Sequence, residues 1–166
     1  MSSAPQPSQP VPPSMVLRPE EIERFDRGNG VVTIPFVGRW NCADNRVTTG
    51  MTVFSPGTGI PLHSHNVEET VLVFDGEATA VVGDDEFDLV AGQATWVPAG
   101  VPHCFRNRGE GTMTIYWVYG GRDVTRTITA TGETFEHLSD SDRGAGPARQ
   151  GDGAGPARQG DSASRA

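Results

Sequence analysis

Short apolar segments separated by turn-forming residues fill the middle of this 166-residue chain. Each segment is rich in valine, threonine and aromatic residues. Glycine, proline, aspartate or asparagine stands between neighbours at a spacing of roughly 8–12 residues. This pattern is typical of one antiparallel sandwich or barrel, so we predict an all-β domain. The expected strands are 31–37, 46–54, 70–74, 78–82, 86–89, 94–97, 103–107, 112–119 and 125–128.

Three of the four histidines lie in two glycine-punctuated stretches within this domain. The first stretch reads G-x5-H-x-H-x3-E-x6-G and runs from Gly57 to Gly76. The second reads G-x5-P-x-G-x2-H-x3-N and runs from Gly92 to Asn107. Three imidazoles and a carboxylate introduced by turns are the ligand types from which divalent metal sites are built.

The spacing of these side chains predicts that they converge on one ion. His63 and His65 are two positions apart, so on a strand both point to the same face. Glu69 begins the next strand, and His103 follows a Pro-Gly turn in a separate hairpin. We therefore predict one divalent metal ion on these four ligands. Three nitrogens and one oxygen suit zinc, iron, manganese or nickel and leave coordination positions open to a substrate.

The two stretches resemble the two signature motifs of the cupin superfamily, and all ten fixed positions match. The resemblance implies a double-stranded β-helix, the cupin jelly-roll barrel, over residues 16–138, commonly as a homodimer. The runs from Arg27 to Val37, Phe54 to Gly57 and Ile60 to Asn66 also look like the small cupins of aromatic polyketide clusters. Those proteins assist the cyclisation of poly-β-ketone chains in antibiotic and spore-pigment pathways.

Three functions stay open at this point. The first is a polyketide cyclase or cyclase accessory, in which the ion polarises a β-keto carbonyl and favours its enolate. The second is an iron- or manganese-dependent dioxygenase acting on a small phenolic or keto substrate. The third is a metal-assisted ligand-binding protein without enzymatic activity. Fold and ligands alone do not select one of them, and no catalytic side chain beyond the ligands is identified.

Strand alternation predicts an apolar, partly aromatic pocket around the ion that suits an aromatic or polyketide-like molecule. In the segment 112–119 the odd-numbered residues are large and apolar, so we expect them to face inward, and the same logic selects the odd positions of 46–54. The expected inward residues are Val47, Thr49, Met51, Val53, Val71, Val73, Phe105, Met113, Ile115, Trp117 and Tyr119.

Two further residues are weaker candidates. Glu68 is one position away from the motif glutamate and is expected to face the other side of its strand. His137 stands outside both motifs, so we expect it on the surface. Tyr116, Tyr119 and Arg39 are possible sources of a hydroxyl or charge near a substrate.

Composition excludes several other classes. The net charge of −8 argues against nucleic acid and anionic membranes as partners. Every basic residue is arginine, which excludes Schiff-base catalysis and a P-loop. No signal-like segment is found at the N-terminus and no apolar run approaches 18 residues, so we expect a cytoplasmic protein with reduced cysteines.

The two ends of the chain have little to bury. Residues 1–15 are mostly proline, serine and glutamine, which predicts a disordered arm. Residues 139–166 contain the nine-residue sequence GAGPARQGD twice, from Gly144 to Asp152 and from Gly153 to Asp161. Two such copies cannot form a packed repeat array, so we predict a disordered tail.

Overall fold

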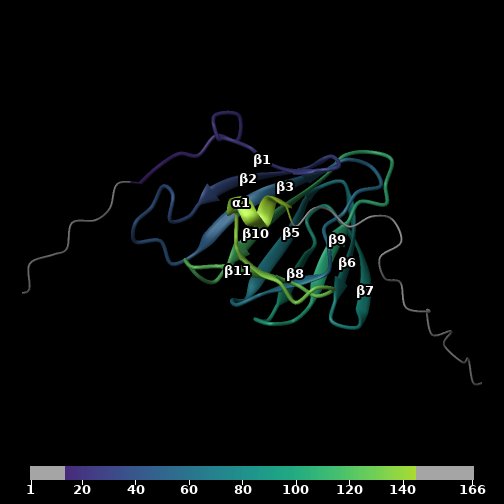
Figure 1. The fold of residues 1–166 in the computed structure, drawn as a ribbon. Coiled ribbons are helices and arrows are strands. Elements are labelled where there is room, and N and C mark those ends of the chain that lie inside the picture. The colour runs from purple at the N-terminus through teal and green to yellow at the C-terminus, as the bar shows by residue number, and fades with distance from the viewer. Residues whose placement is uncertain (1–13, 145–166) are drawn as a thin grey trace, which may run out of the picture.

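Two six-stranded antiparallel sheets face each other and enclose the core (Figure 1). The computed structural model describes residues 14–144. The first sheet has the order β1 (Phe25–Gly28), β2 (Val31–Val37), β3 (Thr48–Phe54), β10 (Met113–Tyr119), β5 (Glu69–Asp75) and β8 (Ala94–Val97). The second has the order β12 (Thr134–Glu136), β11 (Thr125–Ile128), β4 (His63–His65), β9 (His103–Arg106), β6 (Glu77–Val82) and β7 (Asp85–Val90). The predicted all-β jelly-roll barrel is confirmed.

Most strands lie where the alternation of apolar and turn residues predicts them. The bounds of β2, β8 and β11 coincide with the predicted ranges. The short strands β1 and β12 were not predicted, because neither shows an apolar alternation. In β1 the inward positions are Phe25 and Arg27. Because Arg27 is charged although it is buried, the strand shows no alternation of apolar and polar residues.

The ordered fold continues beyond the predicted domain end at residue 138. The helix α1 (Asp140–Gly144) follows β12 and packs against β1 and β12. It is anchored by Asp142, which is 1% exposed and pairs with Arg27 and Arg126. Residues 139–144 therefore belong to the fold rather than to the predicted tail. The remainder of that tail and residues 1–13 of the predicted arm lie outside the described residues.

The predicted facing of β3 is wrong. In β10 the odd residues point inward as expected, and Trp117 is 2% exposed. Its partner across the ladder is Gly50, and Thr52 stands opposite Ile115, so the even positions of β3 face the core. A Cβ atom on Gly50 would lie 2.4 Å from the Trp117 ring. The wide indole therefore needs glycine and threonine opposite it, and the larger residue Met51 turns to the outer face.

Within residues 14–144 both cysteines, Cys42 and Cys104, are free. No helix in this part of the chain has the length and apolar character needed to cross a bilayer.

Candidate metal centre

The three motif histidines meet at the junction of two neighbouring strands of the second sheet. His63 and His65 lie on β4, and His103 is the first residue of β9, directly opposite His63 in the ladder. One nitrogen of each ring lies within 4.8 Å of the others. All three residues are at most 3% exposed, so the cluster is enclosed by the barrel.

Backbone carbonyls set the orientation of all three imidazoles. His63 Nδ1 lies 2.7 Å from the carbonyl of Pro61, and His65 Nδ1 lies 2.8 Å from that of Thr125. His103 Nδ1 lies 2.9 Å from the carbonyl of Val101. Because a carbonyl oxygen only accepts hydrogen bonds, each Nδ1 carries the proton and donates. In each neutral ring the Nε2 atom therefore presents its lone pair to the cluster, as metal-ligating histidines do.

The arrangement of two of these nitrogens fits a cation. The Nε2 atoms of His63 and His65 are 3.1 Å apart, and neither carries a proton in the neutral ring. Two lone pairs at this separation repel each other unless a positive charge lies between them. Nitrogens that share one ion at about 2.1 Å are separated by roughly 3.0–3.4 Å for coordination angles from square to tetrahedral. The observed separation falls inside that range.

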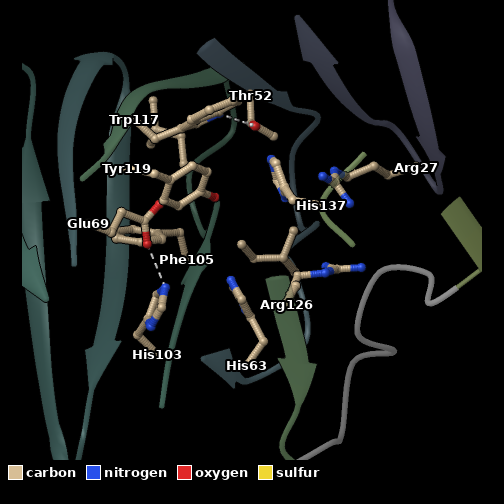
Figure 2. Close-up of a pocket in the computed structure, with 12 residues that line it drawn as sticks. Arg27, Thr52, His63, Glu69, His103, Phe105, Trp117, Tyr119, Arg126 and His137 are labelled. Atoms are coloured by element: carbon tan, nitrogen blue, oxygen red, sulfur yellow. Dashed lines mark hydrogen bonds and ion pairs between the residues drawn. The ribbon is translucent and has the colours of Figure 1, made fainter. Parts of the chain in front are cut away.

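Glu69 supplies the acidic member of the cluster. It is the first residue of β5, and its Oε2 lies 2.6 Å from His103 Nε2 (Figure 2). The same Oε2 lies 3.9 Å from His65 Nε2. The close pair is poorly aligned, and neither atom has a well-formed hydrogen bond among the described residues. Both atoms instead have free electron pairs directed at one small space.

Burial and neighbouring charges fix the protonation of the cluster. Burial holds the pKa of His63 well below its usual value, and the neighbouring imidazoles lower it further. The pKa of His65 is lowered to about 4, chiefly by burial. Burial acts the same way on His103, but the neighbouring Glu69 carboxylate outweighs it and raises its pKa. Glu69 thus favours a positive charge at this position, and a proton and a metal ion compete to supply it.

A small cavity of about 20 Å³ adjoins the cluster. Four of the predicted pocket residues, Phe105, Ile115, Trp117 and Tyr119, line it. The wall also has a polar part that the sequence does not predict. It consists of Arg27, Thr52, Arg126 and His137. The cavity is therefore less apolar than predicted.

The expectation that His137 is a surface residue is wrong. It is 8% exposed and packs its ring against Trp117 and Tyr119, with ring centroids 5.4 and 5.0 Å away. No sequence motif marks this position. The sequence does indicate that Arg126 faces inward, because it stands two positions from Val124 and two from Ile128, which are both buried apolar residues.

The other candidates lie away from the cavity. Glu68 is exposed, and its Oε2 accepts a hydrogen bond of 3.2 Å from Trp96 Nε1, which confirms that it faces outward. Arg39 pairs with Glu136 at the surface. Tyr116 packs against Phe36, with ring centroids 6.1 Å apart, on the outer side of the first sheet.

Comparison with known proteins agrees with this architecture. Residues 50–119 match the family model described as Cupin domain. Quercetin 2,3-dioxygenase of Bacillus subtilis is 29% identical over 129 residues, which cover 74% of this chain and 36% of that protein. The HTH-type transcriptional regulator PuuR of Escherichia coli is 26% identical over 111 residues, covering 66% of this chain and 58% of the regulator. The chain thus spans about a third and about three fifths of the lengths of these relatives.

Solved structures show the same fold. An RmlC-like cupin from Shewanella frigidimarina superposes with a TM-score of 0.54 at 20% identity, over 61% of this chain and 86% of that one. A Bacillus subtilis oxalate decarboxylase, studied for its Mn(II) centres, gives a TM-score of 0.64 at 19% identity, over 76% of this chain and 35% of the decarboxylase. The chain has the cupin fold, and residues 50–119 are similar to the Cupin domain family.

Proposed function

We propose that this protein is a metal-dependent cupin enzyme, an iron or manganese dioxygenase acting on a small phenolic or keto substrate. The observation that carries the proposal is the set of three Nε2 lone pairs directed at one buried space beside a carboxylate. The ion is held by His63, His65, Glu69 and His103. The likeness to quercetin 2,3-dioxygenase supports oxygenation over cyclisation.

The chain's own residues hold and shape this site. Carbonyls fix the histidine rings before an ion arrives, which limits the cost of ordering them on binding. Burial and the charge of Glu69 raise the pKa of Tyr119 well above its usual value, so Tyr119 stays a phenol. Phe105, Ile115 and Trp117 supply an apolar part of the cavity wall. A bound redox-active ion with open positions supplies oxygen chemistry that no side chain here provides.

Oxygen consumption tests the reaction. Protein loaded with Fe(II) or Mn(II) is mixed with quercetin or with pentane-2,4-dione in an oxygen-electrode cell. We expect oxygen uptake matched to substrate loss, with both atoms of ¹⁸O₂ recovered in the product. His63→Ala, which removes one ligand, is expected to abolish uptake and to lower the metal content measured by elemental analysis.

Other outcomes identify the competing functions. Conversion of a β-ketone chain without oxygen uptake would overturn the dioxygenase proposal in favour of a cyclase. Ligand binding without any conversion would indicate a ligand-binding domain, the class to which the likeness to a transcriptional regulator points.

A further inference from the structure

Two buried arginines form the wall of the cavity on the side away from Glu69. Figure 2 shows Arg27 and Arg126 on one side of the view, with Glu69 and Tyr119 on the other. Arg27 is 8% exposed and Arg126 is 3% exposed. The described chain supplies one carboxylate to this pair, that of Asp142. Two guanidinium groups against one carboxylate leave a buried positive charge, which is costly unless an anion compensates it.

The guanidinium groups also have donors to spare. Arg27 donates from Nε to Thr33 over 2.8 Å and from Nη1 to Asp142 over 3.2 Å. Arg126 donates from Nε to the Asp142 carboxylate over 2.6 Å and from Nη2 to its carbonyl over 3.1 Å. Within residues 14–144, Arg27 Nη2 and Arg126 Nη1 make no hydrogen bond. Paired guanidinium forks with free N–H groups match the two oxygens of a carboxylate.

Asp142 belongs to residues 134–144, a segment that contributes His137 to the cavity wall and that we call the C-terminal strap. It consists of β12, His137, Leu138 and α1. His137 lies between the cavity and a second small hollow lined in part by Arg39, Trp40 and Glu136. With the strap in place the cavity of about 20 Å³ holds about one water molecule, so an organic substrate needs the strap to move.

The strap carries two unfavourable features that offset part of its ion pairing. Both ring nitrogens of His137 are buried without a hydrogen-bond partner in the described part of the chain. Leu138 has a φ of 64°, a left-handed conformation that is unfavourable for a non-glycine residue. A closed segment with such penalties opens more readily than a fully satisfied one.

We propose that Arg27 and Arg126 are the binding subsite for a carboxylate group of the substrate, and that Asp142 occupies this subsite until a ligand displaces the strap. The inference rests on the proposed function, because it names the substrate class of the same site. That class is a small phenolic or keto acid, bound by its carboxylate at the arginines with its reacting group toward the histidines. Asp142 acts as an internal stand-in for the substrate's carboxylate.

Binding of a fluorinated acid tests the subsite without reference to turnover. The probe is 4-fluorobenzoate, and its neutral counterpart is 4-fluorobenzyl alcohol. A ¹⁹F NMR titration of the full-length, metal-loaded protein gives the affinity of each.

Asp142→Asn keeps the shape of the side chain and removes the competing charge. We expect it to tighten benzoate binding at least tenfold and to leave alcohol binding unchanged. Asp140→Asn, on the exposed side of the same helix, is the matched control and should change neither.

A second variant separates the arginines from the metal ion as the source of affinity. In Asp142→Asn/Arg126→Gln the gain for benzoate should disappear, because one of the two guanidinium groups is gone. If the gain persists, the ion rather than the arginines binds the acid and the proposal is overturned. It is also overturned if Asp142→Asn leaves benzoate binding unchanged or tightens the alcohol equally.

Hydrogen exchange of the natural chain tests the displacement even if the variants fail to fold. Saturating 4-fluorobenzoate should speed exchange in residues 134–144. The same concentration of the alcohol should not, because a neutral group cannot displace Asp142 from the arginines and so leaves the strap closed. Binding without faster exchange in the strap contradicts displacement of Asp142. Failure of the oxygenase proposal would show as absent oxygen uptake with carboxylate binding intact. Failure of this inference would show as oxygen uptake with neutral phenols and no carboxylate preference.

Discussion

At the scale of single residues, backbone carbonyls make the histidine cluster a set of acceptors. Each Nδ1–H is used by a carbonyl, so the Nε2 atoms have no proton to share in the neutral state. Burial then disfavours protonation of His63 and His65. The cluster therefore favours a cation over further protons, and Glu69 is the one carboxylate within reach of it among the described residues.

Two adjacent glutamates allow a matched test of this cluster. Glu69→Gln keeps the size of the buried side chain but removes its charge, so we expect metal affinity to fall by more than about tenfold. Glu68→Gln makes the same change on the outward side and should leave metal affinity at the natural value. Competition titration with a chelator measures both. Equal losses in the two variants would show that the buried glutamate is not a ligand.

The neutral, buried His137 makes the fold sensitive to acid. Its pKa is held well below the usual 6.5, chiefly by burial and then by Arg27, His65 and Arg126. Asp142 faces it as well, with Oδ2 3.9 Å from Nδ1. As pH falls below 6.5 the unfolded chain gains a proton here that the folded chain does not, so stability is full above 6.5 and declines below it.

His137→Phe should therefore reduce the acid sensitivity. An aromatic ring of similar size keeps the packing but cannot titrate, so the loss of unfolding free energy below pH 6.5 should be smaller by up to about 1.4 kcal/mol per pH unit. His63 and His65 still contribute to the remaining slope. Denaturant unfolding from pH 8 to pH 5, at a fixed metal concentration, measures the difference. Identical pH profiles for the two proteins would mean that His137 has the same pKa in the folded and unfolded chains.

At the scale of elements, β3 and β10 pack together because Gly50 has no side chain at the position opposite Trp117. A Cβ at Gly50 would lie 2.4 Å from Trp117 and 2.6 Å from the Ile34 carbonyl oxygen, so the indole and the neighbouring strand both resist it. We expect Gly50→Ala to lower the free energy of unfolding by about 1–3 kcal/mol. Gly111→Ala, where nothing lies within 4 Å, is the control and should stay within about 0.5 kcal/mol of the natural protein. A tolerated Gly50→Ala would mean that the two strands are farther apart than this structure places them.

The same pair of strands shows how far sequence reasoning reaches. Turn residues and apolar alternation locate β2, β8 and β11 to the residue, and the motif spacing brings three histidines and Glu69 together. Alternation alone does not say which face of β3 is inside, because that depends on the width of Trp117 on another strand. The roles of Arg27, Arg126 and His137 depend on Asp142 in a segment whose composition predicts a tail. Long-range charge pairing of this kind leaves no local pattern.

At the scale of the whole molecule, the outer face of the first sheet carries exposed aromatic side chains. Phe74 on β5 is 61% exposed and Trp96 on β8 is 62% exposed. The ladder pairs put Tyr116 beside Leu72 on the same outward face. Isolated apolar residues are common on surfaces, but apolar side chains on the same face of three neighbouring strands are typical of a face that binds another protein.

A second copy of this chain is the partner expected from the family resemblance. A stable pair buries about 800 Å² on each side around such an apolar centre, and a charge placed there is left without a partner. We therefore expect Phe74→Glu to shift the sedimenting species from dimer to monomer at micromolar concentration. Val90→Glu makes the same change at a half-exposed position on the outer side of the second sheet and should leave the dimer intact. A natural chain that sediments as a monomer, or two variants that dissociate alike, would exclude this face as the dimer interface.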